Sequence, residues 1–470
     1  MKGRLLQNLS INAIQLILNQ LLGLGIFYIL STGLDKPSFG EINLVLAILL
    51  AAFNILSCGI DQLVVKKIAA GDDIRSTLSL YICHVLFTGI VFYGIIIGAY
   101  FLMPHSGLLY WLLALIGAGK LFIFFSTPFK QAANGMERFK MLAYMLVVSN
   151  VIRCFGLIVL SLSGALSLHN IVILFIGGDA AELVFCVLIF VFSVKIPLGV
   201  RWNRVKYFTL LREALPQTGV VLITSALARF DWIFIGILVS TVKLAEYSFA
   251  YKIFEISSLP LLALAPLLIP WFTRIFRQDV IPTEELKLLA RIEMMIAALT
   301  VLLLNICWSP VIDGITAGKY GLINVKTIFI LSLCLPFIYL NNFFWSIYFS
   351  QGYLKMILLS FIITFSVNVA GDIILIPFFK NEGAAAAFLA SCIVQTVYYL
   401  KKNSAIELTK VWQPLLICLL CAASSGFISQ LFFKNNWIML SSAVLIYGLL
   451  LFATKQVRQS DQNIFKRLLS

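Results

Sequence analysis

The chain has 470 residues, of which 61% are hydrophobic and only 12% are charged. Soluble domains carry about 25% charged residues, so the composition excludes a large soluble protein, and the high apolar content excludes a disordered chain. A polytopic membrane protein remains. The net charge of +14 must therefore be sorted by side of the membrane before it is used to infer a partner.

The predicted elements are apolar helices, each near the 20 or so residues that span a bilayer. The first follows a short basic segment without a small-residue cleavage site, so we expect a retained helix with a cytoplasmic N-terminus. Alternating ten-residue segments of the kind that form membrane β-barrels are absent. The fourteen predicted spans are 9–31, 41–60, 78–103, 108–126, 141–162, 169–193, 214–239, 249–272, 289–309, 326–349, 355–377, 384–400, 412–432 and 437–454.

The basic residues are distributed unevenly over this topology. Twenty-five of the 35 Lys and Arg fall in cytoplasmic segments, Lys130 and Arg291 among them, six fall outside and four within spans. This positive-inside asymmetry predicts that both termini are cytoplasmic. After the acids are counted, the net charge is +14 inside, +1 outside and −1 in the membrane. The basic excess therefore indicates orientation and attraction to anionic lipids, and we expect no nucleic-acid partner.

Two weak internal repeats suggest two parallel lobes. Gly40–Ile48 aligns with Ala245–Ile253, and the segment from Glu137 aligns with the segment from Gly352. Parallel repeats predict a transporter with its site between the lobes. The predicted organisation is an N-lobe of six spans (1–193), a basic cytoplasmic linker (194–213), a C-lobe of six spans (214–400) and a final segment with spans thirteen and fourteen and a cytoplasmic tail (401–470).

Ionisable side chains inside the spans are the candidate functional residues, because charge at bilayer depth is costly and marks function by default. Most of them cluster in spans five to eight, where cations could hold phosphate and carboxylates could release it or carry a proton. The nine residues are Lys120, Arg153, Asp179, Glu182, Arg229, Asp231, Lys252, Glu255 and Asp372.

Each of these charges also has a structural interpretation. Arg153 could form a salt bridge with Asp179 or Glu182, which share a helix face. Lys120, expected near the inner end of span four, could extend to the headgroups.

The remaining charges have similar alternatives. Lys252 and Glu255 could be a local ion pair, and Arg229 could pair with Asp231 or with a residue on another helix. Asp372 is expected to be solvated near the outer end of span eleven.

A polar stripe on the first span adds uncharged candidates. Asn12, Gln15 and Asn19 have helical spacing, so they share one face that could line a cavity or form helix–helix hydrogen bonds. No catalytic, metal-binding or cofactor motif is present: there is no P-loop, the three His have no spaced partners, and the nine Cys lack zinc-ligand spacing. We therefore expect a non-enzymatic protein without a cofactor.

Four segments carry a resemblance to a known family. They are Phe39–Gly71 (FGEINLVLAI, then CGIDQLVVKKIAAG), Gln131–Met141 (QAANGMERFKM), Leu211–Ile253 (a basic segment, Leu-Pro, a span with Asp, then AEYSFAYKI) and Ile374–Ser391 (ILIPFFKNEGAAAAFLAS). Together they resemble the polysaccharide transporter branch of the multidrug/oligosaccharidyl-lipid/polysaccharide exporter superfamily, which contains the Wzx-type O-antigen and capsule flippases. Two positions depart from the family pattern. Glu41-Ile42 stands in place of the usual Tyr region, and Ala245-Glu246-Tyr247 replaces Gly-x-Tyr.

The resemblance implies an all-α fold of about fourteen transmembrane helices and alternating access without ATP. It implies a flippase for undecaprenyl-pyrophosphate-linked oligosaccharides, such as O-antigen units for lipopolysaccharide, in the bacterial inner membrane. A polysaccharide polymerase and a chain-length regulator are the expected protein partners, besides membrane lipids. Asp231 and Lys252 occupy signature positions.

From depth and charge we assign two groups of residues. The expected pyrophosphate- and sugar-binding residues are Arg153, Arg229, Lys252, Lys120, Asn12 and Gln15. The expected ion-coupling or ion-pairing residues are Asp179, Glu182, Asp231 and Glu255.

Three alternatives stay open at this point. A drug/cation antiporter of the same superfamily would need a carboxylate in the first span, which has none. A membrane glycosyltransferase or polysaccharide polymerase would need a large outer or catalytic loop. A lipid II flippase is close to the preferred function.

Overall fold

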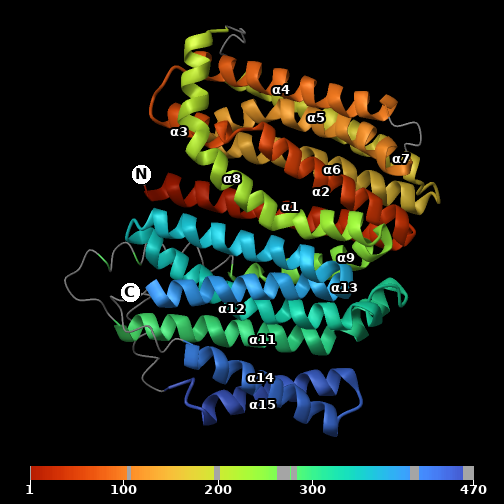
Figure 1. Cartoon of the computed structure of the whole chain (residues 1–470), viewed down its shortest axis with the longest axis vertical. Helices are drawn as coiled ribbons and strands as arrows, with labels where there is room; N and C mark the ends of the chain where they lie inside the picture. Colours follow the sequence, from red (N-terminus) through yellow and green to blue (C-terminus); the bar gives the residue numbers. More distant parts are fainter. Residues whose placement is uncertain are drawn as a thin grey trace. The chain divides into compact units, whose positions relative to one another are not determined.

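The computed structural model describes the backbone of residues 2–102, 107–194, 202–261, 272, 276, 283–402 and 412–458. Every regular element in this part of the chain is a helix, which confirms an all-α polytopic membrane protein (Figure 1). The chain divides into two compact units, Met1–Gly236 and Ile237–Ser470. This division falls near the end of α8 and thus lies C-terminal to the linker predicted from the basic residues. The assignment of lobes remains a prediction.

Unit 1 is a bundle in which α5 occupies the centre. Helices α2, α3, α4, α6 and α7 all pack against it, and α1 packs against α6. The helices α4 to α7 lie side by side in Figure 1. The elements are α1 (Lys2–Gly33), α2 (Lys36–Leu56), α3 (Ile60–Ala69), α4 (Ile74–Leu102), α5 (Leu108–Gly135), α6 (Phe139–Leu162), α7 (Leu168–Val194) and α8 (Arg204–Leu238).

In unit 2, α11 packs against α12, α14 and α15. Helix α13 packs against α12 and α9. Its core is rich in aromatic rings, with Phe343, Phe344 and Tyr399 fully buried. The elements are α9 (Thr241–Ser257), α11 (Thr283–Thr316), η1 (Leu322–Asn324), α12 (Val325–Ser350), α13 (Leu354–Lys402), α14 (Trp412–Phe432) and α15 (Asn436–Ala453).

Eleven helices of the described chain are long and apolar enough to cross a membrane. One of them, α13, consists of two arms that meet at Lys380, where φ is 52°. These arms correspond to the predicted spans 355–377 and 384–400. The predicted span 214–239 lies within α8, whereas 249–272 runs beyond α9 into residues outside the described part.

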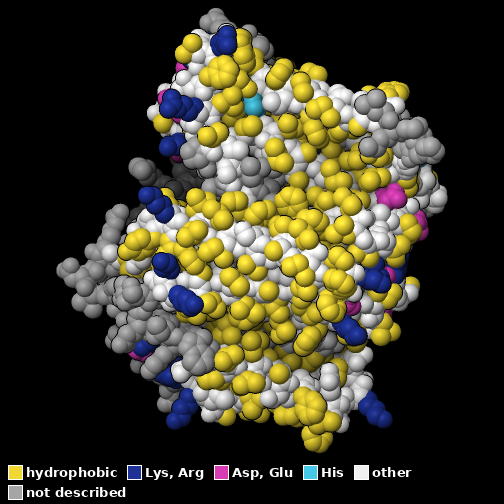
Figure 2. All heavy atoms as spheres, viewed as in Figure 1, with side chains coloured by type: hydrophobic (Ala, Val, Ile, Leu, Met, Phe, Trp, Pro, Cys, Tyr) yellow, Lys and Arg dark blue, Asp and Glu magenta, His cyan; other side chains and the backbone are white. Residues whose placement is uncertain are grey.

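The helix starts follow from local sequence. Asp35 precedes α2 and its carboxylate accepts a hydrogen bond from the Ser38 amide at 3.3 Å, while Pro37 occupies the first turn. Ser240 caps α9 in the same way through the Lys243 amide. On the face shown in Figure 2, hydrophobic side chains cover the helices and most Lys and Arg side chains lie toward helix ends. Both features are those of a bundle surrounded by lipid.

The short helix α3 was not predicted, because a ten-residue charged segment does not have the length or the apolarity of a span. Its acidic residue, Asp61, lies in the first turn and its Lys66 and Lys67 lie in the last turn, as the helix dipole favours. The Tyr81 hydroxyl donates a hydrogen bond to the Asp61 carboxylate. Burial raises the pKa of Asp61 to about 7.

This pKa predicts a pH dependence of stability. Folded Asp61 keeps its proton up to about pH 7, whereas an unfolded Asp releases it near pH 4, so the stability contributed by this group falls as pH rises between these values. We expect the melting temperature of the purified protein to decline over this window, and Asp61→Asn to flatten the decline. An identical pH profile in wild type and variant would contradict the assignment.

Candidate functional site

The candidate site is a cluster of five charged side chains inside unit 1. Lys120 and Lys130 lie on α5, Arg153 on α6, and Asp179 and Glu182 on α7. All but Lys120 are almost fully buried. The three helices pack against one another, so the cluster forms where their faces meet.

Asp179 is the centre of the cluster. Its side chain is 1% exposed, and one carboxylate oxygen accepts a hydrogen bond from the Arg153 guanidinium. The other oxygen lies 3.7 Å from the Lys120 ammonium nitrogen. The guanidinium also lies over the Phe175 ring, 4.8 Å from its centroid. Asp179 is therefore shared between two cations from two different helices.

A second ion pair joins Lys130 to Glu182, one turn further along α7. The sequence analysis placed Lys130 in a cytoplasmic segment beyond span four, whereas the structure places it within α5. The helix α5 extends to Gly135, so Lys130 is a buried residue of that helix and Lys120 lies near its middle, rather than near an inner end.

Small residues allow the helices to approach closely enough for these contacts. A Cβ on Gly119 would lie 2.9 Å from the Asp179 carboxylate and 3.3 Å from the Ile176 backbone. A Cβ on Gly178 would touch the Arg153 side chain at 3.3 Å. A larger residue at Gly119 would push α7 away from α5 and separate Asp179 from Lys120.

The electrostatics of the cluster leave one positive charge in excess, since three cations face two carboxylates. The pairs are a condition for burial, because an isolated charge in an apolar interior is far more costly than a paired one. Lys120 is the least committed cation: its side chain is 23% exposed and its distance to Asp179 is longer than a hydrogen bond. The cluster can therefore accept one further anionic group.

The residues predicted in span seven lie elsewhere in unit 1. Arg229 lies over the Trp232 ring at 4.4 Å, and Asp231 is buried and accepts a hydrogen bond from the Trp232 amide at 2.9 Å. Both residues lie on α8, whereas the five-residue cluster lies on α5, α6 and α7. Their role in binding stays a prediction.

In unit 2, Lys252 and Glu255 form the local ion pair that was one of their two interpretations, at 2.8 Å on α9. Asp372 differs from expectation. It is completely buried on α13 and not solvated, next to Gly371, which packs against Ala387 of the second arm.

The polar stripe of α1 is partly tested. The Asn150 amide nitrogen on α6 donates to the Asn19 side-chain oxygen at 3.1 Å, which is the helix–helix hydrogen bond that was one alternative. Gln15 is half-buried. The side chain of Asn12 lies outside the described residues.

Sequence analysis missed Glu293, a buried carboxylate of α11. It falls within the predicted span 289–309, yet it was not among the nine candidate residues. The apolar residues that follow it were the available signal.

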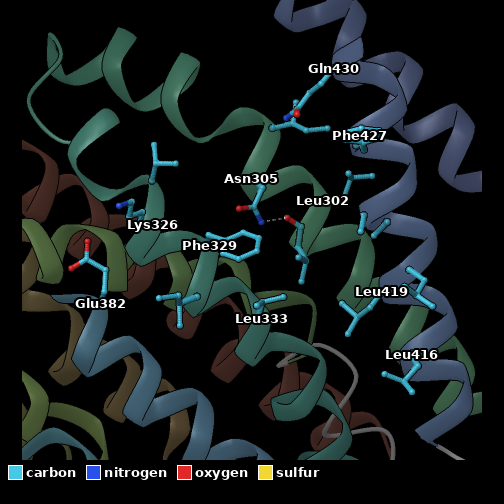
Figure 3. Close-up of a pocket in the computed structure, with 18 of the residues that line it drawn as sticks. Leu302, Asn305, Lys326, Phe329, Leu333, Glu382, Leu416, Leu419, Phe427 and Gln430 are labelled. Carbon is cyan, nitrogen blue, oxygen red and sulfur yellow. Dashed lines mark hydrogen bonds between the residues drawn. The ribbon is translucent and has the colours of Figure 1, made fainter. Parts of the chain in front are cut away.

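Unit 2 also contains an apolar groove of about 1270 Å³ between α11, α12, α14 and the bend of α13. Figure 3 shows Leu416, Leu419 and Phe427 of α14 facing Phe329 and Leu333 of α12. Polar groups are few. Asn305 donates to the Val301 carbonyl at 2.8 Å, and the charged side chains of the lining are Lys326, Lys380 and Glu382.

A family model described as "Polysaccharide biosynthesis protein" matches residues 5–276, more than half of the chain. The chain belongs to this family. The family supports transport, membrane location and polysaccharide biosynthesis as its setting, and the matched residues include the first three of the four motifs. No curated protein sequence matches the chain significantly.

Solved structures show which fold the family member has. The lipid II flippase MurJ in an inward closed conformation superposes with a TM-score of 0.74 at 16% identity, covering 95% of this chain and 99% of that chain. An inward-facing multidrug resistance MATE family transporter of the MOP superfamily gives 0.65 at 15% identity, covering 84% and 99%. The Vibrio cholerae MATE transporter VcmN, as a mutant, gives 0.58 at 12%, covering 86% and 98%. The chain therefore shares the fold of these solved structures.

The buried pair Lys130–Glu182 predicts strong energetic coupling. Lys130→Met or Glu182→Gln alone leaves a buried charge without its partner and should cost about 3–5 kcal/mol, whereas the double variant should cost much less than the sum. The measurement is unfolding of the purified protein in one detergent. The exposed pair Lys287–Glu284, 3.1 Å apart, is the control and should show below about 1 kcal/mol of coupling. Additive effects at Lys130 and Glu182 would contradict the pairing.

Proposed function

We propose that the protein is a flippase for undecaprenyl-pyrophosphate-linked oligosaccharide repeat units, such as O-antigen or other surface-polysaccharide units. The observation that carries this proposal is the buried cluster of three cations and two carboxylates, with its unbalanced positive charge. Membership in a polysaccharide biosynthesis family and the MurJ-like transporter fold support it.

Pyrophosphate suits the chemistry of the cluster. A guanidinium can bind two phosphate oxygens at once, and an ammonium adds a point charge. In the structure Arg153 is engaged by Asp179, and Lys120 contacts the same carboxylate loosely. A pyrophosphate that enters would compete with Asp179 for these two cations. The carboxylates thus compensate the charge of the cations while the site is empty. When the substrate binds, its pyrophosphate replaces the carboxylates as the partner of these cations.

The other candidate residues complete this proposal. Arg229 and Lys252 add cations for the pyrophosphate, and Gln15 and Asn12 add amide groups for the sugars. Asp179, Glu182, Asp231 and Glu255 pair with the cations or couple movement to an ion gradient. Transport proceeds by alternating access.

The apolar groove of unit 2 offers a place for the lipid chain of such a substrate. Its α14 wall runs from Leu416 to Gln430, which is about 21 Å at 1.5 Å per residue. That length covers about two thirds of the 30 Å hydrocarbon core. An isoprenoid chain would replace membrane lipid there without exposing apolar surface to water.

Two related functions compete. The MATE-like fold suggests a drug/cation antiporter, but α1 contains no Asp or Glu to bind the cation. The MurJ-like fold suggests lipid II as substrate. Family membership in polysaccharide biosynthesis favours the oligosaccharide over both. A glycosyltransferase or polymerase activity has no support from the transporter fold.

The proposed location is the bacterial inner membrane, with both termini in the cytoplasm. The proposed partners are membrane lipids and, after translocation, a polysaccharide polymerase and a chain-length regulator that use the delivered units.

The proposal predicts the outcome of complementation in cells that lack their own flippase. Arg153→Ala and Arg229→Ala should abolish surface glycan while the protein still inserts, because a lost charge-assisted contact weakens binding by about tenfold or more. Surface glycan is measured by blotting and insertion by membrane fractionation. Full complementation by both variants would refute the pyrophosphate assignment.

A paired variant separates binding from folding. Arg153→Ala alone leaves Asp179 without the guanidinium, whereas Arg153→Ala with Asp179→Ala removes both charges. We expect the double variant to regain stability and still fail to complement. Recovery of surface glycan by the double variant would show that Arg153 has only a structural role. Lys66→Ala, at an exposed site on α3, is the control that should complement.

A further inference from the structure

Glu293 is a buried carboxylate of unit 2 that phosphate binding does not use. It lies on α11, about ten residues after the helix begins, and is 2% exposed. Within the described part of the chain, neither of its oxygens has a hydrogen-bond partner and no cation forms an ion pair with it. This distinguishes it from Asp179 and Glu182, each of which has a cation.

The groups that surround Glu293 come from three helices. Tyr339 of α12 is fully buried, and α12 packs against α11 in the same hydrophobic core that holds Met294, the residue next to Glu293. On α14, Cys418 is buried in the same core. On α15, the Tyr447 hydroxyl donates to the Met295 carbonyl at 2.9 Å. The buried titratable side chains of this core in the described chain are Tyr339, Tyr348, Tyr399, Cys418, Cys421 and Tyr447, besides the buried Arg291 two residues before Glu293 on α11.

Tyr339 begins a row of polar groups on one face of α12. Asn342 and Ser346 follow it at helical spacing, so the three side chains share a face. The Asn342 amide nitrogen and the Ser346 hydroxyl both lack hydrogen-bond partners in the described chain. The row leads from the neighbourhood of Glu293 toward Ser350, the end of α12 that the topology places at the cytoplasm. Such groups can form the hydrogen-bonded path that a proton needs.

The physical consequence concerns charge. A carboxylate without a cation or hydrogen-bond donor in an apolar core is stable only as the neutral acid, so its ionisation requires water or a conformational change. A group of this kind binds a proton in one state of a transporter and releases it in another. The ion-paired carboxylates of unit 1 are neutralised by Lys and Arg and have no need of a proton.

We propose that Glu293 is a proton-binding site, filled and emptied along Tyr339, Asn342 and Ser346, and that its proton is the ion coupled to substrate movement. The coupling rests on the proposed function, whereas proton binding does not. The proposal reassigns coupling from the four carboxylates selected from the sequence to one that the sequence analysis overlooked.

Infrared spectroscopy of the purified full-length protein in lipid nanodiscs tests proton binding directly. At neutral pH, the spectrum of wild type minus Glu293→Gln should contain a carboxylic-acid C=O band. The same difference for Glu182→Gln should contain carboxylate bands, because Glu182 is paired with Lys130. If the Glu293 difference shows carboxylate bands and no acid band, the proposal is wrong. Size exclusion and circular dichroism check that both variants fold.

Proteoliposomes test the coupling, with a fluorescent undecaprenyl-pyrophosphate oligosaccharide as probe. An imposed pH gradient should accelerate flipping by wild type and by Glu284→Gln, an exposed control on α11, and this response should be lost in Glu293→Gln. A gradient response in Glu293→Gln equal to that of wild type would overturn the coupling. If wild type moves no probe, the proposed function fails, and the infrared result still decides proton binding.

Discussion

The cost of charge in an apolar helix bundle governs this structure. In unit 1, Asp179 links three helices, because it neutralises Arg153 from α6 and lies beside Lys120 from α5. Without it, two cations would face each other in a medium that does not stabilise them. The close approach of α7 to α5 at Gly119 is therefore an electrostatic requirement as well as a packing solution.

The same constraint connects structure to function. Charges that are paired can be buried while no substrate is bound. A polyanionic substrate can then replace the carboxylates as the partner of the cations. The unbalanced charge of the unit 1 cluster supplies this capacity, and the partly exposed Lys120 supplies the point of entry. Unit 2 differs, since Glu293 is buried and has no ion pair among the described residues, so that it is neutral only when it holds a proton. One unit is thus suited to bind an anion and the other to bind a proton.

Much of this could be predicted from the sequence. Hydropathy gave the helical class and most spans, and depth within the spans singled out Arg153, Asp179 and Glu182. For Arg153, the sequence suggested either a salt bridge, with Asp179 or Glu182, or binding of the substrate. The structure contains the ion pair with Asp179. Lys130 was misplaced because charge was used to end span four, although α5 continues past it with its charge neutralised by a distant residue. Such neutralisation depends on the tertiary structure, because the partner residue is far away in the sequence. A local sequence pattern therefore cannot predict it.

The central claim is that buried cations of unit 1 recognise pyrophosphate. The most direct measurement compares the affinity of the purified protein for undecaprenyl pyrophosphate and for undecaprenol, which share the lipid chain. We predict that wild type binds the pyrophosphate at least about tenfold more tightly, as expected for one charge-assisted contact. This preference should vanish when Lys120, Arg153 and Asp179 are all replaced by Ala. An equal preference in wild type and triple variant would contradict the account.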